Sequence, residues 1–379
     1  MINQDRLVAL FLELVRTDSE TGAEGAVAQI CRRELETLGL SVTEDDAGKH
    51  VGSDSGNLMA RLPATAAGQP VLLVNAHMDT VGPGRGVTPV IDGGIIRSDG
   101  TTILGADKKS GLAVILEACR CLLELQLPHG EIEIVFTISE EVDLRGAKFF
   151  DLSWSRADYG YSLDSNLVGG ITVGAPSYNR IDAVIHGLAA HAGVAPQAGL
   201  SAAVIAAKAL ARLPLGKLDD VTTANVGRLS AGVARNVVPA VARLEAEVRS
   251  HDPARLERVT ADIIRILNEE AAAAKTATPE GIVTGRVEIV QELDFEAFSL
   301  AADSPVVARA ERAYANAGIT SCQWKRMGGS DANVFNAKGL PTAVLGTGQD
   351  RVHSLRERIS IADMTAAAEA LVHLLTAES

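Results

Sequence analysis

The sequence has few cysteines, few aromatic residues and no excess of positive charge. Its four cysteines, Cys31, Cys119, Cys121 and Cys322, show neither CxxC spacing nor a disulfide pattern, which excludes a disulfide-dense secreted scaffold. Aromatic residues make up 3% of the chain, so the core must be built mainly from Ala, Val, Leu and Ile. The formal net charge of -13 argues against nucleic acid and anionic membrane surfaces as partners.

Long apolar segments are also missing from the sequence. No stretch resembles a transmembrane helix, and the first residues, Met1-Ile-Asn-Gln-Asp-Arg6, lack the basic and apolar regions of a signal peptide. We therefore expect a cytoplasmic protein. By contrast, the chain is long and rich in glycine. Its 379 residues suggest two domains, and its 35 glycines suit an α/β enzyme with many tight connections.

A short apolar run near residue 72 is the feature around which the chain is organised. Val71 to Val74 favour β structure and are bounded by Pro70 and Gly82, which predicts a buried strand. His77 and Asp79 follow two positions apart, so on an extended backbone both side chains point to the same face. Open α/β sheets bind ligands at strand ends. Taken alone, the pair is equally compatible with a core histidine beside a surface aspartate.

Other side chains of the kind that binds metals recur at the ends of predicted elements. They are Asp107 before an apolar helix, Glu140 and Glu141 after a strand, Asp164 at the end of a strand and His353 after the last strand. If one of the adjacent Glu140 and Glu141 binds metal, these residues and His77 supply two histidines and three carboxylates, which suffice for two divalent cations when one carboxylate bridges. Such ligands suit Zn²⁺, with Mn²⁺ or Co²⁺ as alternatives.

The positions of these side chains predict different roles. Asp107 lies beside a helix start and is the natural bridge between two cations. Glu140 and Glu141 are adjacent, so their side chains diverge, and one can bind metal while the other acts as general base. Asp79 is predicted to hydrogen-bond the free ring nitrogen of His77 and so to support catalysis.

The middle of the chain has a different pattern from its two ends. It contains predicted strands over 178–186, 221–229, 241–250 and 283–291 and helices over 199–213 and 253–274. The order strand, helix, strand, strand, helix, strand is typical of a ferredoxin-like unit. We therefore predict an α/β domain, formed by residues 1–175 and 293–379, that is interrupted by an inserted α+β domain over 176–292. Residues 271–278 are expected to be an alanine-rich helix end.

The candidate metal-site segments resemble those of the M20 metallopeptidase family. The matching segments are His77-Met-Asp79-Thr-Val, Gly105-Ala-Asp107-Lys-Lys109-Ser-Gly, Ser139-Glu-Glu141, Asp164 and His353. The segment Gly93-Gly-Ile-Ile-Arg-Ser-Asp-Gly-Thr-Thr-Ile-Leu-Gly is similar to the peptidase T-like (tripeptidase) branch. The resemblance covers essentially the whole chain. It implies a zinc-exopeptidase-like catalytic domain with a mixed central sheet, two zinc ions, and a ferredoxin-like lid or dimerisation domain through which a homodimer could form.

The resemblance also implies roles for individual metal-site residues. His77, Asp107 and Asp164 would bind one metal. Asp107, Glu141 and His353 would bind the other, and Glu140 would be the general base.

Further residues resemble family positions that contact the substrate. Gly187-Leu-Ala-Ala-His191-Ala-Gly resembles the segment whose histidine stabilises the developing oxyanion. Asn236 and Arg249 match positions that hold the substrate's carboxylate and carbonyl, and arginine suits bidentate carboxylate binding. Gly328, Gly329 and Ser330 resemble a loop that lines the substrate pocket, although an ordinary glycine turn is equally compatible with this segment.

One position departs from the pattern of the branch. Its members usually carry Asp-Asp-Lys where this chain has Asp107-Lys108-Lys109. In the family the peptide bond after the bridging aspartate is typically cis. We expect that bond to be cis here too, and we expect the Lys108 side chain to turn away from the metals.

The sequence is therefore interpreted as a di-zinc aminopeptidase that acts on short peptides. An N-acyl-amino-acid deacylase or a carboxypeptidase is the alternative among enzymes, because the same metal core hydrolyses amides in many substrates. A catalytically impaired metal-binding homologue is the alternative of another class. Lys108 favours that last reading, and the intact Glu140 disfavours it.

Overall fold

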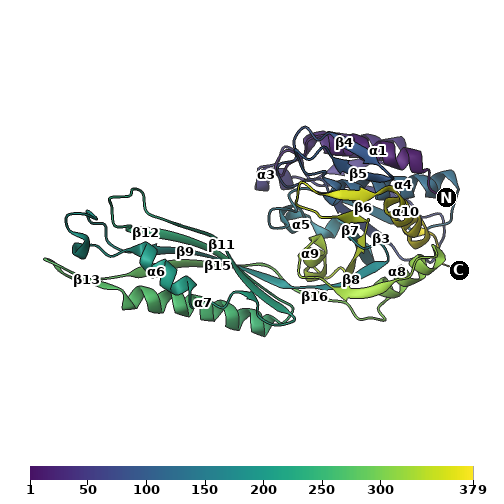
Figure 1. The fold of residues 1–379 in the computed structure, drawn as a ribbon. Coiled ribbons are helices and arrows are strands. Elements are labelled where there is room, and N and C mark those ends of the chain that lie inside the picture. The colour runs from purple at the N-terminus through teal and green to yellow at the C-terminus, as the bar shows by residue number, and fades with distance from the viewer. Residues whose placement is uncertain (379) are drawn as a thin grey trace. The chain divides into compact units, whose positions relative to one another are not determined.

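The computed structural model describes residues 1–378, which fold into two compact units (Figure 1). The first unit consists of Met1–Ala175, Phe298–Arg326 and the segment that begins at Ser330. The inserted unit consists of Pro176–Ala297 and the short segment Met327–Gly329. The inserted domain was predicted over 176–292, so the compact unit begins at the expected residue and extends further, to Ala297.

A mixed sheet forms the centre of the first unit, which confirms the predicted fold class. Its order is β1-β2-β6-β3-β7-β18-β8-β16, and β17 also pairs with β8. The strands are β1 (Val42–Glu44), β2 (Leu58–Leu62), β3 (Leu72–His77), β6 (Ile132–Thr137), β7 (Tyr159–Ser165), β8 (Gly170–Ala175), β16 (Phe298–Ser299), β17 (Cys322–Lys325) and β18 (Thr342–Gly346). Because β6, β3, β7 and β18 run parallel, their carboxyl ends meet at one edge of the sheet.

Helices surround this sheet. They are α1 (Gln4–Arg16), α2 (Gly25–Thr37), α3 (Ala47–Val51), α4 (Ala106–Glu124), α5 (Arg145–Phe149), η1 (Leu152–Trp154), α8 (Pro305–Asn316), α9 (Asp331–Ala337) and α10 (Ile361–Leu375). Side chains alternate along β3: Ala76 lies near α4, whereas Asn75 donates to Asp331 of α9. The sheet is therefore covered on both faces, which explains why every residue of β3 is buried and why its first three residues are apolar.

A second, smaller sheet in the first unit contains a hairpin that turns at Gly93 and Gly94. Its order is β19-β20-β5-β4. The strands are β4 (Pro89–Asp92), β5 (Ile95–Ser98), β19 (Gln349–Asp350) and β20 (Arg358–Ser360). The loop between β19 and β20 carries His353, so this sheet fixes the ends of the loop.

The inserted unit has the strand and helix order that its sequence predicts. Its antiparallel sheet has the order β10-β11-β12-β9-β15, and α6 and α7 lie along one face of it (Figure 1). The elements are β9 (Ser177–His186), η2 (Pro196–Ala198), α6 (Ala202–Leu210), β10 (Gly216–Lys217), β11 (Thr222–Ala231), β12 (Val241–Ser250), α7 (Pro253–Ala273) and β15 (Arg286–Phe295). Burial alternates along β9 and β12, so one face packs on the helices while the other is polar.

Two local predictions were wrong. Residues 275–278 were expected to belong to a helix end but form β13 (Lys275–Thr278), which pairs with β14 (Gly281–Thr284). Thr276 and Thr278 favour an extended backbone, and Gly281 has φ +133° at the turn. The residues of this segment therefore favour a hairpin by themselves. The apolar helix expected after Asp107 instead begins before it, at Ala106, although the backbone at Asp107 and Lys108 is not helical. None of the helices in residues 1–378 combines the length and apolar character needed to span a bilayer.

Candidate metal centre

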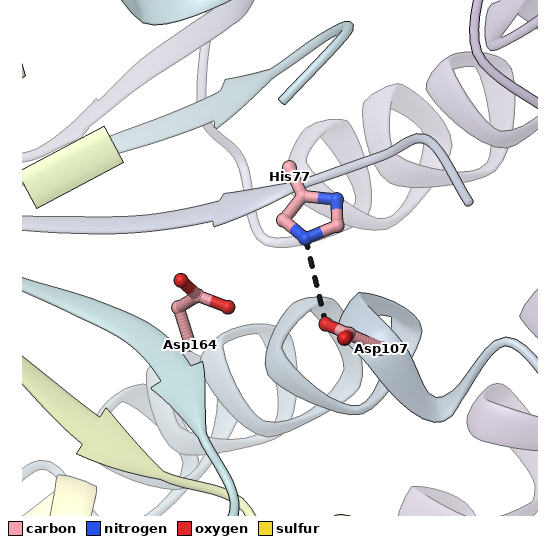
Figure 2. A group of neighbouring side chains, drawn as sticks. All are labelled: His77, Asp107 and Asp164. Atoms are coloured by element: carbon pink, nitrogen blue, oxygen red, sulfur yellow. Dashed lines mark ion pairs between the residues drawn. The ribbon is translucent and has the colours of Figure 1, made fainter. Parts of the chain in front are cut away.

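Predicted ligands from five segments converge at the carboxyl edge of the central sheet. His77 ends β3, Asp164 lies in β7, Asp107 lies in the first turn of α4, and Glu141 follows β6. Figure 2 shows His77, Asp107 and Asp164 pointing toward a common space. One ligand atom from each of these three residues lies within 4.8 Å of the others. The distance from His77 Nε2 to Asp107 Oδ1 is 3.6 Å.

A second group of ligands shares Asp107. His353 Nε2 lies 3.0 Å from Glu141 Oε1 and 3.3 Å from Asp107 Oδ2. Hydrogen bonds to Asp107 and Glu141 raise the pKa of His353 to about 10. Asp107, Glu141 and His353 each place one ligand atom within 4.8 Å of the others. Two carboxylates and one imidazole at such distances fit a divalent cation such as Zn²⁺, Mn²⁺ or Co²⁺. We call Asp107 Oδ2, Glu141 and His353 the open half of the centre, because the His353 side chain is 49% exposed.

Lys108 occupies the other half of the centre, and the expectation that it turns away was wrong. The bond between Asp107 and Lys108 is cis, as expected. However, the Lys108 Nζ lies 2.7 Å from Asp107 Oδ1 and 2.6 Å from Asp164 Oδ1. Burial would lower the pKa of Lys108, but the charges of Asp107 and Asp164 outweigh it and hold the pKa above its ordinary value. We call His77, Asp107 Oδ1, Lys108 and Asp164 the lysine half.

Glu140 lies against His77 and is buried. Its Oε2 is 3.7 Å from His77 Nε2. Burial raises the pKa of Glu140 well above its ordinary value, and the nearby carboxylates of Asp164 and Glu141 act in the same direction. His77, Glu140 and Glu141 also place one ligand atom each within 4.8 Å of one another. A carboxyl group with a raised pKa can both accept and release a proton near neutral pH.

The chain matches a known protein family over most of its length. The profile described as Peptidase family M20/M25/M40 matches residues 73–377. The chain belongs to this family. It is therefore a metallopeptidase of the M20 type, as its motifs predicted.

Individual relatives of this M20 peptidase cover nearly its whole length. A protein of Bacillus subtilis (strain 168) described as uncharacterized protein YqjE is 40% identical, with 99% of each chain covered. The crystal structure of an aminopeptidase PepT from Bacillus cereus is 41% identical, with a TM-score of 0.87 and 99% and 98% of the two chains covered. That of a tripeptidase from Staphylococcus aureus is 39% identical, with a TM-score of 0.92 and the same coverage. The predicted peptidase T-like branch is confirmed.

Asp79 holds the backbone of the M20 site in place. Its Oδ1 accepts the Glu140 N–H at 2.9 Å and its Oδ2 accepts the Glu141 N–H at 3.2 Å. Thr21 donates to the same carboxylate at 2.7 Å. The His77 Nδ1 lies 2.9 Å from the Asp79 carbonyl oxygen and 3.3 Å from its carboxylate, so both groups of Asp79 orient the ring. These contacts place Asp79 where it can position His77 and both glutamates, and its part in catalysis stays a prediction.

Glu357 is a site residue that the sequence did not identify. Its buried carboxylate accepts the N–H groups of Leu104 at 2.9 Å, Gly105 at 2.8 Å and Asp107 at 2.9 Å. Burial raises the pKa of Glu357, whereas these three hydrogen bonds act against it. Glu357 therefore fixes the start of α4 that presents Asp107. Its position four residues after His353 is the one available sequence signal.

The loop of the three predicted pocket residues leads into α9. Ser330 caps this helix and forms a capping box with Asn333. Gly329 approaches the Phe295 ring so closely that a Cβ would lie 2.4 Å from it. Gly328 precedes it in the same loop. Gly329 therefore has a packing reason, and the contact of this loop with substrate stays a prediction.

The other predicted substrate residues belong to the inserted unit. His191 is exposed, and its Nδ1 accepts the N–H groups of Gly193 and Val194, each at 3.2 Å. The Asn236 carbonyl accepts the Ala192 N–H at 3.0 Å, so His191 and Asn236 lie in linked loops. Arg249 stacks over the Tyr178 ring at 4.5 Å.

Arg249 lies at the opposite end of the inserted sheet from those two loops. Val241 of β12 pairs with His186 of β9, whereas Arg249 pairs with Tyr178. The eight-residue separation along an antiparallel strand corresponds to roughly 27 Å. Within one chain the structure therefore brings His191 and Asn236 together and keeps Arg249 apart from them.

Proposed function

We propose that this protein is an aminopeptidase that hydrolyses short peptides with the help of a divalent cation. The observation that carries the proposal is the convergence of Asp107, Glu141 and His353 beside the buried Glu140. The printed descriptions of the two solved structures at 39% and 41% identity, a tripeptidase and an aminopeptidase, support the substrate class. Zinc is the expected metal, with manganese or cobalt as alternatives.

The residues of the centre have different roles in peptide hydrolysis. A divalent cation held by Asp107, Glu141 and His353 would supply a Lewis acid that polarises the scissile carbonyl and increases the acidity of water. Glu140 accepts the proton of the attacking water and returns it to the leaving amine. Asp79 keeps Glu140 in place through its backbone.

His191 supports the reaction by binding the developing oxyanion. Because its Nδ1 accepts two backbone N–H groups, the neutral ring carries its hydrogen on Nε2. A donor N–H directed at an oxyanion stabilises the transition state. Asn236 in the linked loop and Arg249 would bind the carbonyl and carboxylate groups of the peptide, and the loop of Gly328, Gly329 and Ser330 would line its pocket.

The separation of Arg249 from His191 supports the predicted homodimer. If both contact one peptide, they come from two copies of the chain. Mixing inactive Arg249→Ala chains with inactive His191→Ala chains should then restore activity, because one of the two sites in a mixed dimer has both residues intact. Light scattering gives the oligomeric state. A monomeric protein, or mixed chains that stay inactive, would contradict shared sites. The cytoplasmic location also stays a prediction from the sequence.

A peptide panel tests the proposed substrate class. Protein loaded with zinc, manganese or cobalt is offered di-, tri- and tetrapeptides with free and acetylated N-termini, together with N-acyl amino acids. We expect hydrolysis of short peptides with a free amine. Preference for blocked substrates would identify the deacylase or carboxypeptidase alternative, and metal-loaded protein without turnover on any amide would identify the impaired homologue.

A further inference from the structure

The lysine half of the centre already contains a bound cation, the Lys108 ammonium. It lies 2.7 Å from Asp107 Oδ1 and 2.6 Å from Asp164 Oδ1. The Lys108 side chain is 0% exposed, so it contacts neither solvent nor substrate. Its stem passes over Gly111, where a Cβ would lie only 3.2 Å from Lys108 Cγ. The same Cβ would lie 2.8 Å from the Leu163 carbonyl oxygen, so Gly111 lets α4 pack closely on β7 beside the lysine stem.

Asp164 has a cation at each of its two carboxylate oxygens. Lys108 takes Oδ1, and Arg326 Nη1 lies 3.2 Å from Oδ2. Arg326 also donates to the carbonyl oxygen of Asp164. A metal ion bound here would compete with both side chains for the lone pairs of one carboxylate.

The two oxygens of Asp107 divide the centre in the same way. Oδ2 faces His353, which also contacts Glu141. Oδ1 faces Lys108, with His77 3.6 Å away. A bridging carboxylate holds one cation on each oxygen, and in this chain the cation on Oδ1 is the lysine. Like charges repel strongly at such distances in a buried site, so an additional divalent ion is disfavoured there.

From this arrangement we infer that Lys108 replaces one of the two divalent cations implied by the family resemblance. The protein then uses a single exchangeable ion, held by Asp107, Glu141 and His353. Lys108 is a positioning residue that keeps Asp107 and Asp164 neutralised and Asp107 Oδ2 directed at that ion. His77 is not a ligand in this arrangement, and its ring orients Glu140 instead. The inference rests on the proposed metal centre and is independent of the substrate.

Metal content tests the inference without any assay of activity. The full chain is stripped with a chelator and dialysed against zinc chloride, and zinc per chain is measured by mass spectrometry. We expect one zinc ion per chain in the natural protein. Two ions would overturn the inference. No bound ion at all would instead overturn the proposed metal centre, so the two failures are distinguishable.

Substitutions of Lys108 sharpen the test. Lys108→Met removes the ammonium at similar length, and Lys108→Asp introduces the residue usual in the branch. Both should raise the content from one to two zinc ions, whereas Lys108→Arg should keep it at one. The matched control is Lys109→Met, because Lys109 is also buried but donates to Thr17 O at 2.7 Å. It should keep one ion. A single ion in folded Lys108→Met protein would contradict the inference.

Substitution of Asp164 provides a second measurement, and its first part does not depend on whether Lys108→Met folds. In the natural background, Asp164→Asn should leave the zinc content at one ion, because Asp164 binds Lys108 and not the metal. In the Lys108→Met background it should return the content from two ions to one. Loss of the single ion from Asp164→Asn alone would show that Asp164 is a ligand and would overturn the inference. Circular dichroism confirms that each variant is folded.

Discussion

The two halves of the metal centre share one carboxylate but differ in exposure and in charge. In the lysine half, Asp107 Oδ1 and Asp164 contact a side chain that is 0% exposed. In the open half, Asp107 Oδ2 contacts His353, which is 49% exposed. An ion or a peptide can therefore approach the open half, whereas the lysine half is closed to both.

If Lys108 replaces one of two cations, a single residue accounts for the difference between the halves. A residue tethered next to the shared ligand can carry a fixed positive charge to the place of an exchangeable ion. The fixed charge neutralises Asp107 and Asp164, but it offers no open coordination position and no Lewis acidity. Catalysis then depends on the open half and on Glu140 between the two halves.

Loss of a ligand in the open half should have the largest effect. His353→Ala removes the exposed ligand, so the chain should lose its bound zinc. Because a Lewis acid contributes several kcal/mol to the transition state, kcat/KM should fall by about a thousandfold or more. His50→Ala is the control, since His50 lies on α3 and stacks on Phe149. Metal analysis and peptide assays check both; zinc retained by His353→Ala would contradict the open half as the ion site.

Removal of the general base should separate metal binding from turnover. Glu140→Gln keeps the size of the side chain but cannot accept the proton. Turnover should fall by about 10²–10⁴-fold while zinc content stays unchanged. The neighbouring variant Glu141→Gln should instead lose the ion. Equal zinc loss in both variants would show that the two glutamates do not have separate roles.

A smaller effect is expected from the residue that positions both glutamates. Asp79→Asn turns one acceptor of the Glu140 and Glu141 N–H groups into an amide N–H₂ group. We expect kcat/KM to fall by about 10–100-fold, with one zinc ion bound less tightly. Asp99→Asn on the surface is the control. Steady-state kinetics measure the fall in kcat/KM, and zinc titration measures the weaker binding of the ion. Unchanged kinetics would rule out the positioning role.

The last prediction concerns the stability of the protein near the lysine half, and it has a defined pH dependence. Burial raises the pKa of Asp331 to about 6, although Thr137 and Asn75 donate to its carboxylate. A folded-state pKa above the unfolded value means that the native state binds more protons. The contribution of Asp331 to stability is therefore present below pH about 4 and is lost as the pH rises through about 6.

The variant Asp331→Asn isolates this effect because it cannot ionise. In metal-free protein at pH 8 it should be more stable than the natural chain by up to roughly 3 kcal/mol, with a much smaller difference at pH 4. Urea unfolding at both pH values measures this. An equal difference at both pH values would show that the ionisation of Asp331 is not the cause.

The fold was predictable where local pattern and packing agree. The apolar run before His77 gave a strand because both of its faces are buried, and the amphipathic segment from Pro253 gave α7 within one residue of its end. The hairpin that begins at Lys275 was missed because the alanines before it favour a helix. The threonines that favour a strand occupy only a few positions. The bounds of β15 were also misjudged. The strand predicted over 283–291 lies at Arg286–Phe295, because Gly285 separates it from β14.

The candidate site was predictable as a set of residues but not in its internal contacts. The order of His77, Asp107, Glu141, Asp164 and His353 follows strand ends, which parallel strands bring to one edge. The direction of Lys108 could not be read from the sequence, because it depends on the space over Gly111 and on the separation of two carboxylates that are far apart in the chain. Glu357 was missed for a similar reason: its partners are backbone N–H groups.

Diffraction from crystals of the natural chain soaked in zinc, recorded at the zinc absorption edge, is the most direct test of a single-ion centre. Anomalous scattering locates each zinc ion independently of the protein atoms. We expect one peak, bounded by Asp107 Oδ2, Glu141 and His353, with Lys108 between Asp107 and Asp164. A second peak between Asp107 and Asp164, with the Lys108 side chain displaced, would contradict a single-ion centre.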